Sequence, residues 1–186
     1  QVYVWRDRGL VRAMIERARA IKAALAPFHV PLLINDRVDV ALAAAADGVH
    51  VGQTDMAVED ARRLLGPDAI IGLSIKTAAQ AEAAPIENLN YAAIGGVFAT
   101  ASKDNPGPPI GAAGLAGIAE IFRRRAPKFP LCGIAGIDAT NAGDTIAAGA
   151  DGVAVISALS LASDPQAAAR ALRGIVDATL AQRGRR

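Results

Sequence analysis

The sequence is poor in several features that mark particular classes of protein. Its 186 residues include one cysteine, one tryptophan and two methionines, and aromatic residues make up 4% of the chain. A single cysteine cannot form an internal disulfide, which excludes a disulfide-stabilised scaffold and favours a reducing compartment such as the cytoplasm. No apolar run approaches the ~20 residues that a membrane-spanning helix needs, so we expect a soluble protein with no membrane partner.

Charge of one sign is also scarce. The 20 basic and 18 acidic residues leave a formal net charge of +2, which is too near neutral to argue for nucleic acid as a partner. The hydrophobic content is 52%, and a chain of this length can fill one core. We therefore predict a single domain over residues 1–186.

Short apolar segments alternate with alanine-rich amphipathic segments along the whole chain. The apolar segments predict strands at residues 2–5, 31–34, 48–51, 70–73, 92–97, 131–134 and 152–156. The segments between them predict helices near residues 9–27, 37–45, 57–65, 77–84, 112–126, 139–148 and 165–182. This alternation is typical of an α/β fold with a parallel sheet. Because the strands read as nearly continuous Val, Ile and Leu, the sheet should be covered on both faces.

An internal repeat supports the alternation. The segment Ala-Ala-Asp-Gly-Val-His-Val at 45–51 reappears as Gly-Ala-Asp-Gly-Val-Ala-Val at 149–155. Either one βα unit is reused around a barrel, or the shared letters are ordinary chemistry of a helix-to-strand loop. Both interpretations favour strands that begin directly after the Asp-Gly pairs.

Polar residues follow each predicted strand, where parallel α/β folds collect their chemistry. Asp36 and Asp55 follow the second and third strands and suit Mg²⁺, a hard cation that binds carboxylates and substrate phosphates. The alternative for each is a helix cap, because a predicted helix begins shortly after each aspartate.

Cations and glycines extend this set. Arg6, Arg8 and Lys103 could hold a phosphate or diphosphate, although solvated surface charges are the alternative. The turn at residues 133–137, with Gly133 and Gly136, would let backbone N–H groups approach a phosphate, unless it serves tight turning alone. The long segment 99–111 is a candidate active-site loop. We expect His50 to be an interior histidine and Cys132 a small core residue.

The ordered motifs resemble thiamine phosphate synthases. The resemblance rests on Trp-Arg-Asp-Arg at 5–8, Leu-Ile-Asn-Asp-Arg at 33–37, Ala-Asp-Gly-Val-His-Val-Gly-Gln-Thr-Asp at 46–55 and Ile-Gly-Leu-Ser at 71–74. It continues through Gly-Val-Phe-Ala-Thr-Ala-Ser-Lys at 96–103, Gly-Ile-Ala-Gly-Ile at 133–137 and Ala-Asp-Gly-Val-Ala-Val-Ile-Ser at 150–157. These motifs keep the family's order over nearly the whole chain.

This resemblance implies a TIM (β/α)8 barrel and a transferase that acts on small molecules. The family joins 4-amino-5-hydroxymethyl-2-methylpyrimidine diphosphate to 4-methyl-5-(2-hydroxyethyl)thiazole phosphate and releases diphosphate, with Mg²⁺ as cofactor. A homodimer is a further family-level expectation. The family's strand order places the strand at 2–5 second in the barrel, so we expect the first βα unit to be missing from this chain.

Each site residue is assigned only through the resemblance. Asp36 and Asp55 would bind Mg²⁺, and Arg6, Arg8 and Lys103 would hold the diphosphate. Asn35 and Ser74 would contact the pyrimidine substrate, with Ser74 and Lys103 serving the catalytic step. The thiazole phosphate would meet Thr100, Ala101, Ser102, Gly136, Ile156 and Ser157.

The chain departs from the family pattern at a few positions. Val4 and Arg8 replace a Gln and a Lys, Lys76 replaces a His, and Ala135 replaces the first glycine of a pair. Two alternatives remain open at this point: a thiazole tautomerase of the same superfamily, and a non-catalytic paralogue that binds thiamine phosphate. The presence of Asp36, Asp55, Arg6 and Lys103 favours the synthase over the tautomerase, because a tautomerase does not need to grip a metal and a diphosphate.

Overall fold

The computed structural model describes residues 1–6, 9–100 and 108–184. Within them the chain forms two compact units. The first unit contains residues 1–74 and 85–91, and the second contains residues 75–84 and 92–186. In both units the predicted alternation of strands and helices is confirmed, and the strands that pair do so in parallel.

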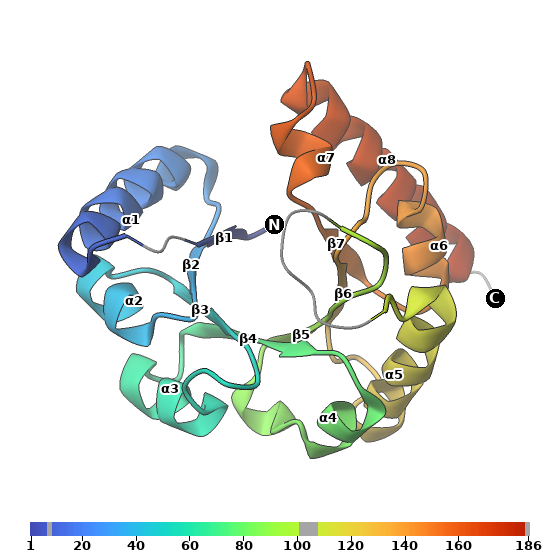
Figure 1. The fold of residues 1–186 in the computed structure, drawn as a ribbon, viewed down its shortest axis with the longest axis horizontal. Helices are drawn as coiled ribbons and strands as arrows, with labels where there is room; N and C mark the ends of the chain where they lie inside the picture. Colours follow the sequence, from blue (N-terminus) through green and yellow to red (C-terminus); the bar gives the residue numbers. More distant parts are fainter. Residues whose placement is uncertain (7–8, 101–107, 185–186) are drawn as a thin grey trace. The chain divides into compact units, whose positions relative to one another are not determined.

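The first unit has strands in the order β1, β2, β3 and β4. The strands are β1 (Tyr3–Trp5), β2 (Leu32–Asn35), β3 (Gly48–Val51) and β4 (Ile70–Ile75), whose last residue belongs to the second unit. The helical elements are α1 (Val11–Leu25), η1 (Ala26–Phe28), α2 (Val38–Ala44), α3 (Val58–Leu65) and η2 (Ile86–Asn88). Figure 1 shows α1, α2 and α3 side by side along the strands of this unit.

The second unit has strands in the order β5, β6 and β7. These are β5 (Tyr91–Ile94), which begins on the last residue of the first unit, β6 (Leu131–Ile134) and β7 (Gly152–Ala154). Its helices are α4 (Ala78–Ala83), α5 (Gly111–Arg125), α6 (Ala142–Ala147), α7 (Ser157–Ser160) and α8 (Pro165–Arg183). The helix α7 is an addition to the sequence prediction, as is η2, whereas η1 continues the segment predicted as a helix near residues 9–27.

The core confirms that inner strands such as β2 and β3 are covered on both faces, whereas Tyr3 and Val4 of β1 are exposed. Every residue of β3 is buried, and in β2 the consecutive residues Leu32, Leu33 and Ile34 are at most 1% exposed. In the second unit, Ile94 of β5 packs in a core that also holds Leu115 and Phe122 of α5. Apolar side chains that alternate in direction along a strand can all be buried only if both faces are packed.

Local sequence signals explain where two of the helices begin. Thr77 and Gln80 form a capping box on α4: the Gln80 N–H donates to the Thr77 hydroxyl, and the Thr77 N–H donates to the Gln80 side chain. Asp164 accepts a hydrogen bond from the Ala167 N–H at the start of α8, and Pro165 takes the first helical position. Both arrangements satisfy N–H groups that a helix start otherwise leaves without a partner.

No helix in the described part of the chain has both the length and the apolar character that a membrane-spanning segment requires.

Candidate active site

The carboxyl ends of the first unit's strands bring most of its predicted site residues to one edge. Asn35, the last residue of β2, lies opposite His50 of β3, and His50 lies opposite Gly72 of β4. Arg6 follows β1 and is exposed, whereas Ser74 lies two residues beyond Gly72 and is half-buried. Parallel strands in register present their ends at a common edge. The edge therefore carries a cation, an amide and a hydroxyl.

Asp36 adopts a backbone conformation that a helix cap does not use. Its φ is +64°, in the left-handed region, and its N–H donates to the His50 carbonyl at 2.8 Å. The N-cap of α2 is Arg37, and no side chain caps that helix. The capping alternative is therefore wrong for Asp36. A non-glycine residue held at positive φ is uncommon and concentrates at functional sites.

Asp55 likewise does not cap the helix that follows it. The N-cap of α3 is Ala57, again without a side-chain hydrogen bond. One carboxylate oxygen of Asp55, Oδ2, accepts a hydrogen bond from the Gly52 N–H at 2.7 Å, which closes the turn after β3. The residue is exposed. Asp55 thus lies in a turn at the end of β3, with a carboxylate that solvent can reach.

Arg37, the next residue of the Asn-Asp-Arg motif, is engaged within its own helix start. Its guanidinium makes two hydrogen bonds to the Asp39 carboxylate, with Nε 2.8 Å from Oδ1. This hydrogen bonding holds the pKa of Asp39 below its usual range. The bidentate pair orients Arg37 along α2 and explains an arginine at this position without a substrate contact.

Ser74 is held by a group of neighbouring side chains. Its hydroxyl oxygen lies 2.9 Å from Nε2 of His50, whose Nδ1 lies 2.8 Å from the hydroxyl oxygen of Tyr91. Gln53 donates from its side-chain amide to the Ser74 carbonyl at 2.7 Å. His50 is 8% exposed, which confirms the prediction of an interior histidine. The motif that contains Gln53 was visible in the sequence, but nothing in the sequence indicated that Tyr91 reaches this group.

In the second unit, Lys76 follows the end of β4. A Cβ built on Gly96 would lie 3.0 Å from Cε of Lys76, and Gly96 has a φ of +70°. The methylene chain of this half-buried lysine therefore packs against Gly96, which lies just after β5. Thr100, a few residues further on, is half-buried. The lysine that replaces the family's histidine thus lies at the carboxyl end of β5.

A strained turn follows β6. Ala135 has a φ of +89° and Gly136 a φ of +65°. A Cβ on Gly136 would lie 2.3 Å from the Ala99 carbonyl oxygen, so this position has no room for a side chain. The next helix, α6, begins at Ala142 rather than near residue 139, so the turn is further from a helix N-terminus than the sequence indicates. The structure supports tight turning here.

The remaining predicted residues fall at the end of β7 or outside the described residues. Ile156 and Ser157 are both exposed, and α7 begins at Ser157. Four predicted site residues lie outside the described residues: Arg8, Ala101, Ser102 and Lys103. Most of the candidate loop at 99–111 shares this position, since residues 101–107 are not described.

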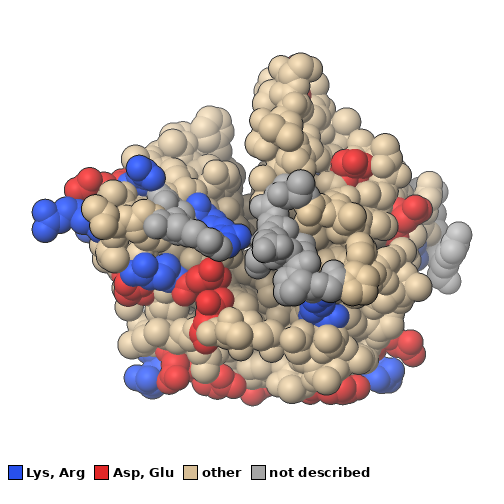
Figure 2. All heavy atoms as spheres, viewed as in Figure 1, with Lys and Arg blue, Asp and Glu red and all other residues tan. Residues whose placement is uncertain are grey.

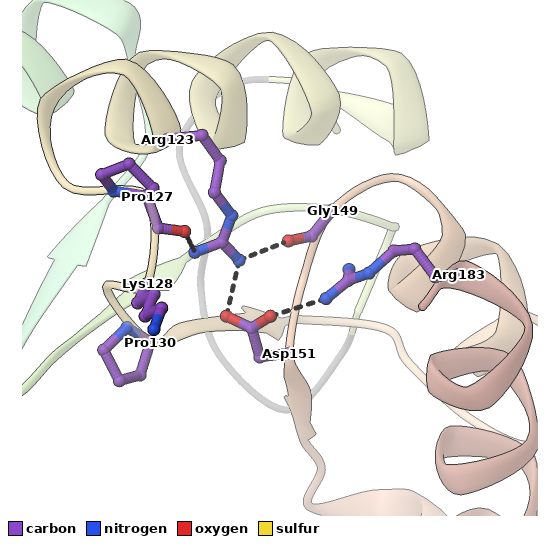
Figure 3. A pocket seen from close by; sticks show the side chains of 7 residues that line it. All are labelled: Arg123, Pro127, Lys128, Pro130, Gly149, Asp151 and Arg183. Carbon is purple, nitrogen blue, oxygen red and sulfur yellow. Dashed lines mark hydrogen bonds and ion pairs between the residues drawn. The ribbon is translucent and has the colours of Figure 1, made fainter. Parts of the chain in front are cut away.

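A surface hollow of about 470 Å³ occurs away from these residues, in the second unit. Its lining comprises Arg123, Pro127, Lys128, Pro130, Gly149, Asp151 and Arg183 (Figure 3). Pro130, Gly149 and Asp151 precede β6 and β7, so the hollow lies at the amino ends of the strands. Both arginines bond to Asp151 and to backbone carbonyls. These bonds and the position at the amino ends indicate a stabilising role rather than catalysis.

The described side chains do not form a complete set of metal ligands. Among the described residues, no group of three or more His, Cys, Asp or Glu side chains could hold a metal ion. On the face shown in Figure 2, described basic and acidic side chains are interspersed, and large areas are uncharged.

Comparison with known proteins connects these residues to a family. A family model described as thiamine monophosphate synthase matches residues 2–159. The chain is 50% identical to thiamine-phosphate synthase of Agrobacterium fabrum over 180 residues, covering 96% of this chain and 82% of that protein. The chain belongs to the thiamine monophosphate synthase family. This finding confirms the resemblance seen in the sequence.

Structural comparison agrees with the family membership. Thiamine phosphate pyrophosphorylase from Pyrococcus furiosus matches with a TM-score of 0.82 and 35% identity over 95% of this chain and 83% of that one. This likeness confirms the predicted TIM-barrel fold class. A 3-hexulose-6-phosphate synthase from Salmonella typhimurium, 19% identical with a TM-score of 0.71 over 96% of this chain and 88% of that one, shares the fold. Within this family, the residues at the carboxyl ends of the strands are the candidate active site.

Proposed function

We propose that this chain is a thiamine phosphate synthase, a transferase that joins the pyrimidine diphosphate to the thiazole phosphate. Family membership over most of the chain is the observation that carries the proposal. The site residues of the first unit support it, because the two aspartates that follow β2 and β3 have no capping role to explain them. The substrates are the two small molecules that the family resemblance implies.

The proposed reaction is a substitution at the pyrimidine methylene carbon. The carbon–oxygen bond to diphosphate breaks, and diphosphate leaves with the bonding electron pair. The thiazole nitrogen then donates its lone pair to the resulting cation and forms the new carbon–nitrogen bond. Since that nitrogen carries no proton, no general base is required. Groups that stabilise the negative charge on the departing diphosphate accelerate such a step.

Asp36 and Asp55 are the residues that would hold Mg²⁺. Both supply carboxylate oxygens, which this hard cation prefers. The Gly52 N–H uses one lone pair of Asp55, and the other carboxylate oxygen of this exposed residue is open to a further partner. Mg²⁺ would neutralise charge on the diphosphate oxygens. Two protein carboxylates plus substrate phosphates make an ordinary Mg²⁺ site.

The other residues assigned to the pyrimidine diphosphate would act on the same substrate. Arg6 and Arg8, together with Lys103, would bind the diphosphate oxygens, since guanidinium and ammonium groups pair with phosphate. Asn35 would hydrogen-bond the pyrimidine ring. We assign Ser74 and Lys103 to the catalytic step, where a hydroxyl donor and an ammonium group offset the charge of the leaving group.

The thiazole phosphate would bind the residues that follow the strands of the second unit. The hydroxyl groups of Thr100 and Ser102 would donate hydrogen bonds to the phosphate, and the backbone of Ala101 between them would also contact it. Backbone N–H groups at Gly136, Ile156 and Ser157 would complete the phosphate contacts.

An assay with both substrates tests the proposal. Purified protein incubated with the pyrimidine diphosphate, the thiazole phosphate and MgCl₂ should yield thiamine phosphate and diphosphate in equal amounts. A folded sample that forms neither product would refute the synthase and leave the non-catalytic paralogue. Turnover of the thiazole phosphate alone, without diphosphate release, would instead identify the tautomerase.

Three broader features are part of the proposal. We infer that the chain works as one TIM-barrel domain, that it acts in the cytoplasm, and that it forms a homodimer. The fold class supports the first inference, and the single cysteine supports a reducing compartment. The dimer rests on the family resemblance, and sedimentation of the purified protein measures it directly.

A further inference from the structure

Three side chains of the first unit form a chain of hydrogen bonds that ends at Ser74. The hydroxyl oxygen of Tyr91, at the start of β5, lies 2.8 Å from Nδ1 of His50. Nε2 of His50 lies 2.9 Å from the Ser74 hydroxyl oxygen. The Tyr91 and His50 rings also stack, with centroids 5.6 Å apart and planes inclined by 30°. The imidazole is therefore fixed on both nitrogens and on one ring face.

Gly72 provides the space that this arrangement needs. It pairs with His50 in the register of β3 and β4. A Cβ at Gly72 would lie 2.1 Å from Cζ of Tyr91 and 2.5 Å from its hydroxyl oxygen. Any larger residue would therefore displace the tyrosine ring from His50. The contact between His50 and Tyr91 therefore depends on a glycine at position 72.

The two hydrogen bonds must run in the same direction if the imidazole is neutral. A neutral histidine has one N–H donor and one acceptor nitrogen. Either Tyr91 donates to Nδ1 and Nε2–H donates to Ser74, or Ser74 donates to Nε2 and Nδ1–H donates to Tyr91. In the first arrangement the proton of the Ser74 hydroxyl is available to another acceptor. In the second arrangement the Ser74 hydroxyl already donates that proton to Nε2 of His50.

The chemistry of the two hydroxyl groups favours the first arrangement. A tyrosine phenol is more acidic than a serine hydroxyl and is therefore the stronger donor to an imidazole nitrogen. The better donor thus faces Nδ1, which leaves the proton on Nε2 and makes the Ser74 oxygen an acceptor.

We propose that His50 is a positioning residue that donates from Nε2 to Ser74 and thereby directs the Ser74 hydroxyl proton toward the diphosphate of the bound substrate. The proposal rests on the synthase function for its substrate but not for its geometry. A pre-aimed hydroxyl needs no reorientation when charge develops on the leaving group. Tyr91 acts one step further away, by fixing the histidine tautomer.

The tautomer is directly measurable in the unmodified protein. The chain has only two histidines, so nitrogen-15 NMR of histidine-labelled protein yields two imidazole systems. His29 is exposed and at a φ of +53°, a conformation that asparagine tolerates, so His29→Asn assigns the spectrum and leaves synthase activity unchanged. We expect His50 to carry its proton on Nε2 at neutral pH. A proton on Nδ1 would overturn the proposal, whatever the protein catalyses.

Kinetics of a double-mutant cycle test the action through Ser74. We expect Ser74→Ala to lower kcat about 100-fold and His50→Asn about tenfold, with KM for both substrates nearly unchanged. In the Ser74→Ala background, His50→Asn should cost less than about twofold, because the group that it positions is gone. Equal losses in both backgrounds would overturn the proposal. Tyr91→Phe, which removes one oxygen atom, should lower kcat about threefold and shift the His50 tautomer toward Nδ1–H.

Failure of the synthase proposal and failure of this inference give different results. If the wild-type protein forms no thiamine phosphate, the function is wrong, while the NMR spectrum still reports the tautomer. If the wild type is active but the cycle shows independent losses, the function stands and the positioning role is wrong. Circular dichroism of each variant shows whether a buried substitution at His50 has changed the fold.

Discussion

Asp47 in the first unit and Asp151 in the second make equivalent pairs of hydrogen bonds to the neighbouring strand. The Asp47 N–H donates to the Leu32 carbonyl at 2.9 Å, and its carboxylate accepts from the Leu32 N–H at 2.8 Å. Asp151 does the same with Leu131, at 2.7 and 2.9 Å. The repeated Ala-Asp-Gly-Val segments therefore have equivalent positions, where each aspartate fixes the start of one strand against the next.

Basic side chains neutralise both aspartates, but not equally. Lys22 lies 3.0 Å from Asp47. Arg123 and Arg183 each lie 2.6 Å from a different oxygen of Asp151, and both also donate to backbone carbonyls around the hollow of Figure 3. Asp151 therefore connects α5, α8 and the start of β6, whereas Asp47 connects α1 to the start of β2.

Asp151→Ala should destabilise the protein. The substitution leaves the Leu131 N–H without its carboxylate partner and removes the common partner of two guanidinium groups. With these side chains about a third exposed, we expect the free energy of unfolding to fall by about 2 kcal/mol. Urea denaturation measures the change. Asp177→Ala, which removes only an exposed ion pair with Arg173, should cost less than about 0.5 kcal/mol; equal losses in both variants would contradict the assignment.

Exchanging alanine and glycine after β6 should have opposite effects at neighbouring positions. Ala135 has a φ of +89°, which strains any residue with a Cβ, so Ala135→Gly should raise the free energy of unfolding by about 1 kcal/mol. Gly136→Ala introduces the same strain and places a Cβ 2.3 Å from the Ala99 carbonyl oxygen, so it should lower that free energy by more than about 2 kcal/mol. Thermal and urea unfolding of the two single variants test the signs, and two changes of the same sign would contradict the argument.

The strands were predictable because short apolar segments leave a strong local signal, which is clearest for the buried inner strands β2 and β3. All seven occur where such segments indicated them, with ends displaced by three residues or fewer. The helix α7 was missed because its four residues are too short to show a helical period. The helix α6 is shorter than predicted, since the residues before Ala142 form a turn stabilised by hydrogen bonds around Asp138 and Asn141.

The surroundings of Ser74 show what local sequence cannot reveal. The motif placed Ser74 at the end of a strand, and the alternation indicated that His50 is interior. The hydrogen bonds between them depend on the register of β3 and β4 and on a tyrosine 41 residues beyond His50. The same limit applies to Asp36, because the local sequence is compatible with both a helix-capping position and a left-handed turn. Only the φ of +64° in the structure separates the two.

Cys132, which is half-buried in β6, should react slowly with thiol reagents. Burial, with a smaller effect from the Asp151 carboxylate, raises the pKa of its thiol from 9.0 to about 12. Three pKa units leave about 1,000-fold less thiolate at pH 8 than an unperturbed cysteine has. Because the folded-state pKa is raised, folding retains a proton that the unfolded chain releases, so this group's contribution to stability falls as the pH rises from about 9 to 12.

A disulfide reagent such as DTNB measures the reactivity at Cys132, the chain's single cysteine. We expect one equivalent to react rapidly in denaturant and labelling of the native protein at pH 8 to be slower by about the factor given by the thiolate fraction. Labelling of the native protein at the rate of a free thiol would show that the pKa of the Cys132 thiol is not raised in the folded protein.

Asp55→Asn should separate the folding role of this residue from its proposed role in binding Mg²⁺. Asparagine retains an oxygen that can accept the hydrogen bond from the Gly52 N–H, so the melting temperature should change by less than about 2 °C. The amide lacks the negative charge that makes a carboxylate a stronger Mg²⁺ ligand, so the Mg²⁺ concentration for half-maximal activity should rise at least about tenfold. Titration of activity with MgCl₂ measures this shift.

Asp60→Asn removes an exposed carboxylate that pairs with Arg63 on the adjoining helix and should leave the Mg²⁺ requirement unchanged. An unaltered requirement in Asp55→Asn would show that this aspartate serves only the turn.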